Sequence, residues 1–238
     1  LQLADGLFET VLIQGGEPQL LEEHLLRWAT SANLLGMASP PERSHLQPLI
    51  EEATMRCGLQ RGSGVLRLNW SRGASRQRGI DVPQPAQHRF WMTLESGEPT
   101  FRGITAIICQ QERRNADSLI SRCKTFAYGQ AVLARQEASQ QGCNDALLLN
   151  TKNQLCSGTV ANLIVKRNGN WLTPPLSSGC LPGVMRGRAL TLGLIEEAEL
   201  ESDLRPNDEA ALINSLSCRP VIALNGLPRA QADAEHFW

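Results

Sequence analysis

The chain of 238 residues has 20 arginines but only three lysines, Lys124, Lys152 and Lys166. A lysine amine can attack a carbonyl carbon and form a Schiff base, provided that its pKa allows a neutral form. Lys152 lies in Thr-Lys-Asn-Gln and Lys166 precedes Arg-Asn-Gly-Asn, and both sequences are typical of polar turns. We therefore interpret Lys152 and Lys166 as solvated surface residues.

Lys124 has a different setting, Arg-Cys-Lys-Thr-Phe-Ala-Tyr, just ahead of a predicted helix. Apolar residues flank it, and the positive end of the helix dipole disfavours a second cation nearby. Burial and positive charge both lower the pKa of a lysine, as a Schiff-base amine requires. From the residues alone, an ordinary lysine beside a helix is still the simpler interpretation.

The elements around these residues form two groups. The first group contains predicted strands at 7–13, 64–70 and 88–95 and helices at 17–35 and 40–59. The second contains strands at 104–109, 145–150, 163–166, 210–214 and 221–224 and helices at 128–140 and 184–197. Because strands and helices mix without strict alternation, we expect an α+β or α/β chain of two domains. They are a small N-terminal domain at 1–96, a linker at 97–102 and a larger C-terminal domain at 103–238 that carries Lys124.

Composition removes several classes of function. The formal net charge of −1 disfavours a nucleic-acid partner, and no apolar run approaches the length of a membrane span. The first nine residues do not resemble a signal peptide. Seven scattered cysteines without a Cys-x-x-Cys pair suit reduced thiols in the cytoplasm. The four histidines are isolated, so we expect no metal.

Six motifs in one order resemble those of the class IV aminotransferases, the pyridoxal 5'-phosphate (PLP) enzymes of fold type IV. They are Asp-Gly-Leu-Phe-Glu-Thr at 5–10, Glu-Glu-His-Leu-Leu-Arg at 22–27, Lys-Thr-Phe-Ala-Tyr at 124–128, Gly-Thr-Val-Ala-Asn-Leu at 158–163, Thr-Pro-Pro-Leu at 173–176 and Gly-Cys-Leu-Pro-Gly-Val-Met-Arg at 179–186. The resemblance runs nearly end to end. It implies a fold like that of D-amino-acid aminotransferase, a small-molecule substrate and a homodimer with the cofactor between its domains.

The resemblance also assigns roles to single residues. Lys124 would form the Schiff base with PLP and then act as the proton-shuttling base. Arg27 would bind the cofactor's phosphate with its fork of N–H donors. The other expected cofactor-binding residues are the backbone N–H groups of Val184 and Met185 at a helix start, the Ser215 hydroxyl, and Tyr128 on the cofactor's phenolic oxygen.

Three departures from the family pattern matter for the reaction. Ser157 stands where the family has a glutamate that pairs with the pyridine nitrogen, and a hydroxyl cannot keep that nitrogen protonated. Met185 replaces a threonine and loses a phosphate-binding hydroxyl. The segment 214–220 looks one residue short. The chain also lacks the strand that usually precedes the first motif, so we expect a short variant.

Within the family we favour the lyase branch. Ser-Arg-Gly at 71–73 followed by Arg-Gly-Ile at 78–80 resembles a stretch of aminodeoxychorismate lyase, a folate-biosynthesis enzyme that converts 4-amino-4-deoxychorismate to p-aminobenzoate and pyruvate. Arg72 is our candidate for binding a substrate carboxylate. One alternative is an aminotransferase for branched-chain or D-amino acids, which Ser157 disfavours. Another is a degenerate, non-catalytic family member.

Overall fold

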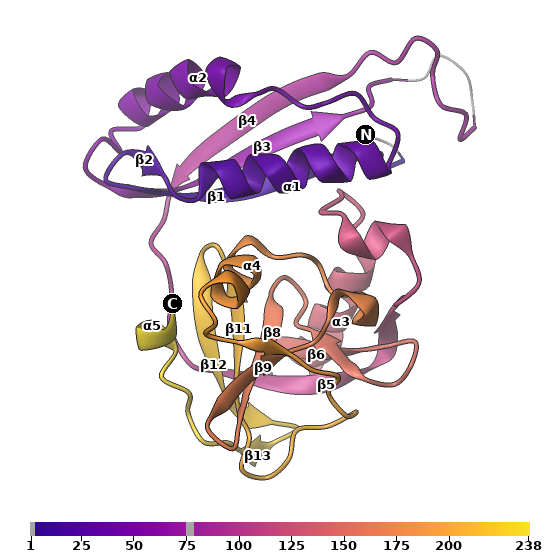
Figure 1. Cartoon of the computed structure of the whole chain (residues 1–238), viewed down its shortest axis with the longest axis vertical. Helices are drawn as coiled ribbons and strands as arrows, with labels where there is room; N and C mark the ends of the chain where they lie inside the picture. The colour runs from indigo at the N-terminus through magenta and orange to yellow at the C-terminus, as the bar shows by residue number, and fades with distance from the viewer. Residues whose placement is uncertain (1–2, 75–78) are drawn as a thin grey trace. The chain divides into compact units, whose positions relative to one another are not determined.

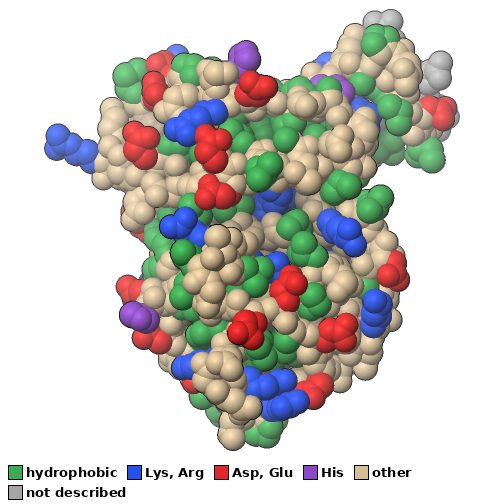
Figure 2. Space-filling model, viewed as in Figure 1, with side chains coloured by type: hydrophobic (Ala, Val, Ile, Leu, Met, Phe, Trp, Pro, Cys, Tyr) green, Lys and Arg blue, Asp and Glu red, His purple; other side chains and the backbone are tan. Residues whose placement is uncertain are grey.

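The computed structural model describes residues 3–74 and 79–238. Contacts divide the chain into two compact units, the first being Leu1–Glu98 with Cys123–Ala127 and the second Pro99–Arg122 with Tyr128–Trp238. Acidic and basic side chains are interspersed on the face of each unit that Figure 2 shows. In the described ranges, no helix is both long and apolar enough to cross a bilayer. Arg78, which belongs to the lyase-like stretch, lies outside the described residues.

The first unit is an antiparallel sheet with two helices (Figure 1). Alternation along its strands separates the two faces. Leu7, Val11 and Ile13 pack with Trp28 and Leu46 in an apolar core on the helix side. The strands, in the order β2-β1-β3-β4, and the helices are β1 (Gly6–Gln14), β2 (Glu17–Pro18), β3 (Ser63–Ser71), β4 (Arg89–Ser96), α1 (Leu21–Leu34) and α2 (Arg43–Arg56).

Helix α1 begins four residues later than the helix predicted at 17–35. Glu17 and Pro18 instead pair with β1 as the short strand β2. Leu20 has a left-handed φ of 52°, so the backbone cannot enter the helix before Leu21. The apolar spacing that predicted the helix is correct, but the turn before it adds a hairpin.

The segment Cys123–Ala127 lies along the free edge of β1. The N–H of Phe8 donates to the carbonyl of Lys124 at 2.9 Å, and the N–H of Phe126 donates to Gly6 at 3.0 Å. We predicted that the C-terminal domain carries Lys124, whereas these bonds place its segment in the first unit. The contact division also falls between Glu98 and Pro99, inside the predicted linker. The predicted domain bounds, 1–96 and 103–238, stay a prediction.

The second unit is built on a nine-stranded sheet in the order β10-β9-β8-β11-β12-β5-β6-β7, with β13 on β12. An extra pairing between β7 and β8 closes six of these strands into a ring, whose interior is apolar. The strands are β5 (Ile104–Arg114), β6 (Asp145–Asn150), β7 (Leu155–Ser157), β8 (Asn162–Arg167), β9 (Asn170–Thr173), β10 (Glu196–Glu197), β11 (Glu209–Asn214), β12 (Ser217–Leu224) and β13 (Leu227–Pro228).

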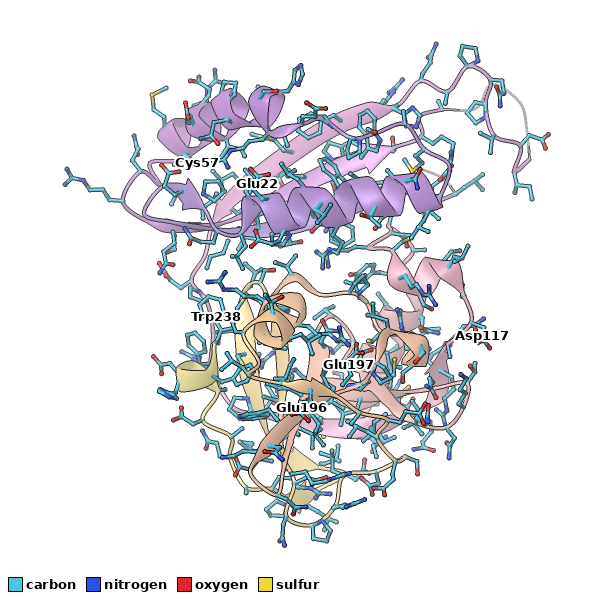
Figure 3. The ribbon with its side chains drawn as sticks, viewed as in Figure 1. Glu22, Cys57, Asp117, Glu196, Glu197 and Trp238 are labelled. Atoms are coloured by element: carbon cyan, nitrogen blue, oxygen red, sulfur yellow. The ribbon has the colours of Figure 1, made fainter. Side chains whose placement is uncertain are left out.

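Helices cover the outside of this sheet (Figure 1). Ala134 and Ala138 on α3 pack against β5 and β6, and α4 packs against β11. Trp238, which is labelled in Figure 3, donates from its indole Nε1 to the carbonyl of Asn214 at 3.1 Å. The helices are α3 (Gly129–Gln140), α4 (Val184–Thr191) and α5 (Ala234–Phe237), with 3-10 turns η1 (Leu119–Arg122) and η2 (Leu176–Ser178).

The second unit differs from the prediction mainly in its short strands. The helix predicted at 184–197 ends at Thr191, because Gly193 takes a left-handed φ of 67° and allows a C-terminal turn. Glu196 and Glu197 then form β10. Strands β7, β9 and β13 are too short for a periodic pattern to be read from the sequence. Parallel pairs join β5 to β6 and β12, while most other pairs are antiparallel, so the predicted α+β class is confirmed.

Candidate active site

Glu9 lies at the centre of a buried polar cluster in the first unit. It occupies a core-facing position of β1 and is 1% exposed. Its carboxylate accepts from Arg27 Nε at 2.9 Å and also from Arg27 Nη2, and it lies 2.7 Å from Nδ1 of His24. His24 and Arg27 stand three residues apart, on one face of α1. The motif of α1 therefore presents both side chains to one carboxylate.

The electrostatics of this cluster favour the ionised carboxylate. Burial alone would raise the pKa of Glu9, but the Arg27 cation and the hydrogen bond to His24 lower the pKa to about 2. Glu9 thus holds the Arg27 guanidinium in one orientation by two hydrogen bonds and by charge. An arginine fixed in this way is suited to bind a second, ligand anion.

Lys124 lies on the opposite face of the same sheet. Its Nζ is 4.5 Å from the ring centroid of Phe8, and the Arg67 guanidinium carbon is 3.6 Å from the same centroid. Phe126 and Phe8 are stacked at 6.2 Å. Because successive residues of a strand alternate, Phe8 and Arg67 face away from the helices. The structure therefore brings an amine and a guanidinium to one aromatic ring.

Arg72 has a different environment from the one we expected. Its Nε donates to Asp5 at 2.6 Å, while Nη1 and Nη2 donate to the carbonyls of Gly36 and Leu35 at 3.0 and 2.8 Å. The two carbonyls belong to the end of α1, where helices leave acceptors unpaired. Arg72 thus stabilises this end of the helix. A substrate role for Arg72 stays a prediction that these bonds do not favour.

Ser157 ends β7 in the second unit and is buried. Its register partners on the two neighbouring strands are Leu148 and Asn162, neither of which is acidic. Burial, with Cys180 next in effect, raises the pKa of the adjacent Cys156 to about 12, so this thiol is neutral. The two residues in register with Ser157 and the preceding thiol therefore supply no negative charge in place of the family's glutamate. The acid of β6, Asp145, instead accepts from the N–H and hydroxyl of Thr159.

The start of α4 forms a compact cradle. The N-cap is Gly183, and no side chain caps the first turn of the helix. A Cβ at Gly183 would lie 1.9 Å from Oδ1 of Asn162, whose Nδ2 donates to Leu181 at 2.8 Å. The close approach requires glycine and leaves the N–H groups of Val184 and Met185 as anion donors. The Met185 side chain packs against a hydrophobic cluster, so it offers no hydroxyl.

Tyr128 and Ser215 also lie in the second unit. Tyr128 is the N-cap residue of α3 and is half-buried. Ser215 occupies the two-residue turn between β11 and β12, where Asn214 Oδ1 accepts from the N–H of Leu216 at 2.8 Å and from the Ser217 hydroxyl at 3.0 Å. The segment that looked one residue short is thus a tight hairpin with Asn214 bracing the turn.

The predicted residues therefore fall into two sets. Arg27, Lys124 and Arg72 belong to the first unit, and Tyr128, Ser157, Val184, Met185 and Ser215 belong to the second. Sequence reasoning did not select Glu9 and Arg67. An acid inside the apolar strand 7–13, and an arginine between Leu66 and Leu68, were the signals available for them.

Each unit, taken by itself, carries groups that suit part of a cofactor with an aldehyde and a phosphate. Lys124 is an amine held beside an aromatic ring, Arg27 is fixed by Glu9, and Gly183 opens a helix start that a Cβ would fill. These are the groups that bind an aldehyde carbon and a phosphate anion. A second arginine, Arg186 of α4, pairs with Glu197, which is labelled in Figure 3.

Solved structures share this fold. A candidate 4-amino-4-deoxychorismate lyase from Legionella pneumophila superposes with a TM-score of 0.88 at 22% identity, covering 99% of this chain and 88% of that one. A fold IV transaminase from Curtobacterium pusillum gives 0.84 at 24% identity, covering 100% and 82%. The predicted fold type IV architecture is confirmed.

Sequence comparison gives the family. The model of amino-transferase class IV matches residues 6–224, so the chain belongs to the class IV aminotransferase family. It is therefore a PLP-dependent enzyme. A candidate aminodeoxychorismate lyase of Schizosaccharomyces pombe is 29% identical over 227 residues, which are 92% of this chain and 90% of that protein. A bifunctional aminodeoxychorismate lyase and D-amino acid transaminase of Mycobacterium tuberculosis is 27% identical over 188 residues, covering 72% and 62%.

Proposed function

We propose that the enzyme is a lyase that converts 4-amino-4-deoxychorismate to p-aminobenzoate and pyruvate without a keto-acid co-substrate. The observation that carries this proposal is the setting of Ser157. It is buried between Leu148 and Asn162, with a neutral thiol before it, so no carboxylate faces it in register. Transamination depends more strongly on a protonated ring nitrogen than elimination does, because aromatisation of the product drives elimination.

We propose four groups as donors to the cofactor's phosphate. Arg27, oriented by Glu9, would donate from its guanidinium. The N–H groups of Val184 and Met185 and the hydroxyl of Ser215 would add neutral donors. Tyr128 would donate to the phenolic oxygen. When bound, PLP supplies an aldehyde that condenses with amines and a ring that accepts electrons.

Lys124 and Arg67 would act on the substrate. Lys124 Nζ would take the proton from the ring carbon that bears the substrate's amino group. The bond from the ring to the enolpyruvyl oxygen then breaks and the carbocycle becomes aromatic, and the released enolpyruvate takes up a proton to become pyruvate. Arg67 lies over the same Phe8 ring as Lys124 and would bind a substrate carboxylate. Arg72 is not given this role, because its donors bond to Asp5 and to the end of α1.

An assay with and without a keto acid tests the proposed reaction. Purified enzyme with added PLP should release p-aminobenzoate and pyruvate from 4-amino-4-deoxychorismate at equal rates in the absence of any keto acid. Amino transfer from D-alanine or leucine to 2-oxoglutarate should be slower by orders of magnitude. Fast transfer with no p-aminobenzoate would instead support the aminotransferase alternative, which the bifunctional relative of Mycobacterium tuberculosis keeps open.

A spectral control tests the cofactor site itself. The loaded enzyme should be yellow and should lose its visible absorption band on borohydride reduction. The reduced cofactor should then be attached covalently to the peptide that contains Lys124. Lys124→Ala should abolish the band and the activity, since a covalent step without its amine commonly loses several orders of magnitude in rate. A wild-type protein that takes up no PLP would overturn the proposal.

We also propose that the enzyme is a homodimer. Apolar side chains are exposed on α3 and beside it, with Val132 at 61%, Leu133 at 46% and Val160 at 47%. Arg135 on α3 donates to Thr159, which precedes Val160, so these side chains form one region of the second unit. Clustered exposed apolar side chains are typical of an interface. Val160→Glu should shift sedimentation from a dimer to a monomer if this region is the contact.

A further inference from the structure

Arg114, at the end of β5, joins two loops that are far apart in the sequence. Its Nη2 donates to the carbonyl of Ser121 at 2.8 Å, and its Nε donates to the carbonyl of Gly179 at 3.1 Å. Ser121 lies in η1, and Gly179 closes η2. Both bonds run from a cation to a backbone acceptor, which makes them stronger than bonds between neutral groups.

The two loops are in direct contact around this guanidinium. Gly179 has a φ of 87°, and a Cβ there would lie 2.9 Å from the carbonyl oxygen of Asn115. That carbonyl accepts from the Ser121 hydroxyl at 2.8 Å. The N–H of Ala116 donates to Thr151 Oγ1 at 3.2 Å. The glycine thus lets the segment after Arg114 pack against the η2 loop, and Arg114 bonds to both.

Each loop leads directly to a residue of the proposed site. Ser121 precedes Lys124 by three residues, and Gly179 precedes Gly183, the N-cap of α4, by four. Asn162 Nδ2 donates to the carbonyl of the intervening Leu181 at 2.8 Å, which restricts the movement of the segment between Gly179 and α4. If either carbonyl moved, the segment that follows it would move as well, and each of these segments carries a proposed cofactor-binding group.

We propose that Arg114 is a positioning residue that holds the η1 loop, which leads to Lys124, against the η2 loop, which leads to the anion-binding start of α4. This inference rests on the proposed roles of Lys124 and α4. The Arg114 side chain itself contacts neither substrate nor cofactor in the proposal. Its two carbonyl partners are bound by two separate nitrogens, Nε and Nη2, in one rigid plane, whereas the donors of an ammonium all leave a single nitrogen.

A further contact places Arg114 near the strand that ends in Ser157. Burial raises the pKa of Cys156 and Cys180, and the positive charge of Arg114 opposes that rise in both thiols. Cys156 precedes Ser157, and its thiol donates to the carbonyl of Ser178 at 3.1 Å. Arg114 is thus close to the β7 segment as well as to the two loops.

Hydrogen exchange of the protein without cofactor tests the link directly. In Arg114→Gln, amides in 119–127 and in 176–184 should both exchange faster than in the wild type, while amides of β11 and β12 should not change. Arg113→Gln is the matched control, because Arg113 donates from Nη1 only to carbonyls of its own strand, Cys109, Gln110 and Glu112. It should leave both segments unchanged. Faster exchange in one segment alone, or in neither, would overturn the inference.

Cofactor titration tests the consequence for the site. The dissociation constant for PLP, followed by the visible band, should rise about tenfold or more in Arg114→Gln, the equivalent of losing roughly one charge-assisted hydrogen bond. Arg114→Lys should recover only part of the affinity, and Arg113→Gln should match the wild type. Unchanged affinity in Arg114→Gln would overturn the positioning role even if exchange rises.

The two proposals fail in different ways. If the wild type binds no PLP, the proposed function fails while the exchange result still decides whether Arg114 links the loops. If the wild type binds PLP and Arg114→Gln binds it equally well, only the inference about Arg114 fails. Should Arg114→Gln not fold, Arg114→Lys serves in both measurements, because it retains the positive charge and a single donor nitrogen.

Discussion

Glu9 on β1 and Arg27 on α1 form a buried ion pair in which one carboxylate accepts from two nitrogens of one guanidinium. Removing either partner would leave the other charged and buried, at a large free-energy cost. The pair thus joins the first helix to the first strand and at the same time orients the proposed phosphate ligand.

The Glu9 pair predicts a specific loss of stability in acid. The pKa of Glu9 is lowered from 4.5 to about 2 in the fold, against the effect of burial, by Arg27 and His24. Because the pKa of Glu9 is lower in the folded than in the unfolded chain, the ionised carboxylate stabilises the fold fully above pH 4.5. This stabilisation is lost as the pH falls toward 2. It corresponds to roughly 3 kcal/mol.

Urea unfolding of the wild type and Glu9→Gln between about pH 6 and pH 2 measures this contribution. Glu9→Gln should be less stable at the upper end, and the difference from the wild type should shrink as the pH falls. A difference that stays constant across this range would show that the ionised carboxylate is not its source.

Arg72 should matter for stability more than for substrate binding. Arg72→Met removes three hydrogen bonds that hold Asp5 and the end of α1, so we expect a loss of about 2–4 kcal/mol in the free energy of unfolding and little change in KM. Exposed Arg89 is the control, and Arg89→Met should have little effect on either. A large rise in KM at unchanged stability would restore the substrate role that the sequence indicated for Arg72.

Arg67, unlike Arg72, should matter for substrate binding more than for stability. Arg67→Met should raise KM for a carboxylate substrate about 10–100-fold, as the loss of a charge-assisted hydrogen bond implies, and Arg67→Lys should recover part of it, because charge remains but the fork is lost. The visible band should persist in both variants, since Lys124 is intact. Steady-state kinetics with wild-type KM in Arg67→Met would remove Arg67 from the proposed site.

Ser157→Glu should change which reaction is favoured. A carboxylate at this position would keep the ring nitrogen protonated and strengthen electron withdrawal, so keto-acid-dependent amino transfer should rise above the wild-type level. Ser157→Ala is the control, and it should not raise transfer. Rapid amino transfer by the wild type itself would contradict the electron-withdrawal argument.

Gly183 should be intolerant of a side chain. Gly183→Ala places a Cβ 1.9 Å from Asn162 Oδ1, so Asn162 or the helix start must move. We expect a loss of about 1–3 kcal/mol in stability and weaker PLP binding in a titration. Gly187, one turn further along α4, has open space around it. Gly187→Ala should be neutral or stabilising by up to roughly 1 kcal/mol, and equal effects of the two variants would argue against the cradle.

Local patterns in the sequence predict most of the longer elements. Apolar spacing identifies α1, proline and glycine signals identify α2, a run of β-forming residues identifies β1, and β6 has the predicted bounds. The order of six motifs indicates the family that the family model confirms. Strands of two to four residues carry no period, so β2, β7 and β9 could not be found in this way.

The sequence by itself determines the chemistry that is available: one lysine in the family's motif, an arginine in the helix motif, and a serine in place of the glutamate. The partners of these groups are decided only by the tertiary structure, because strand pairing and packing join residues that are remote along the chain. Such contacts pair Glu9 with Arg27 and place Lys124 and Arg67 beside one aromatic ring. They also place the lysine segment in the first unit and bond Arg72 to the carbonyls at the end of α1.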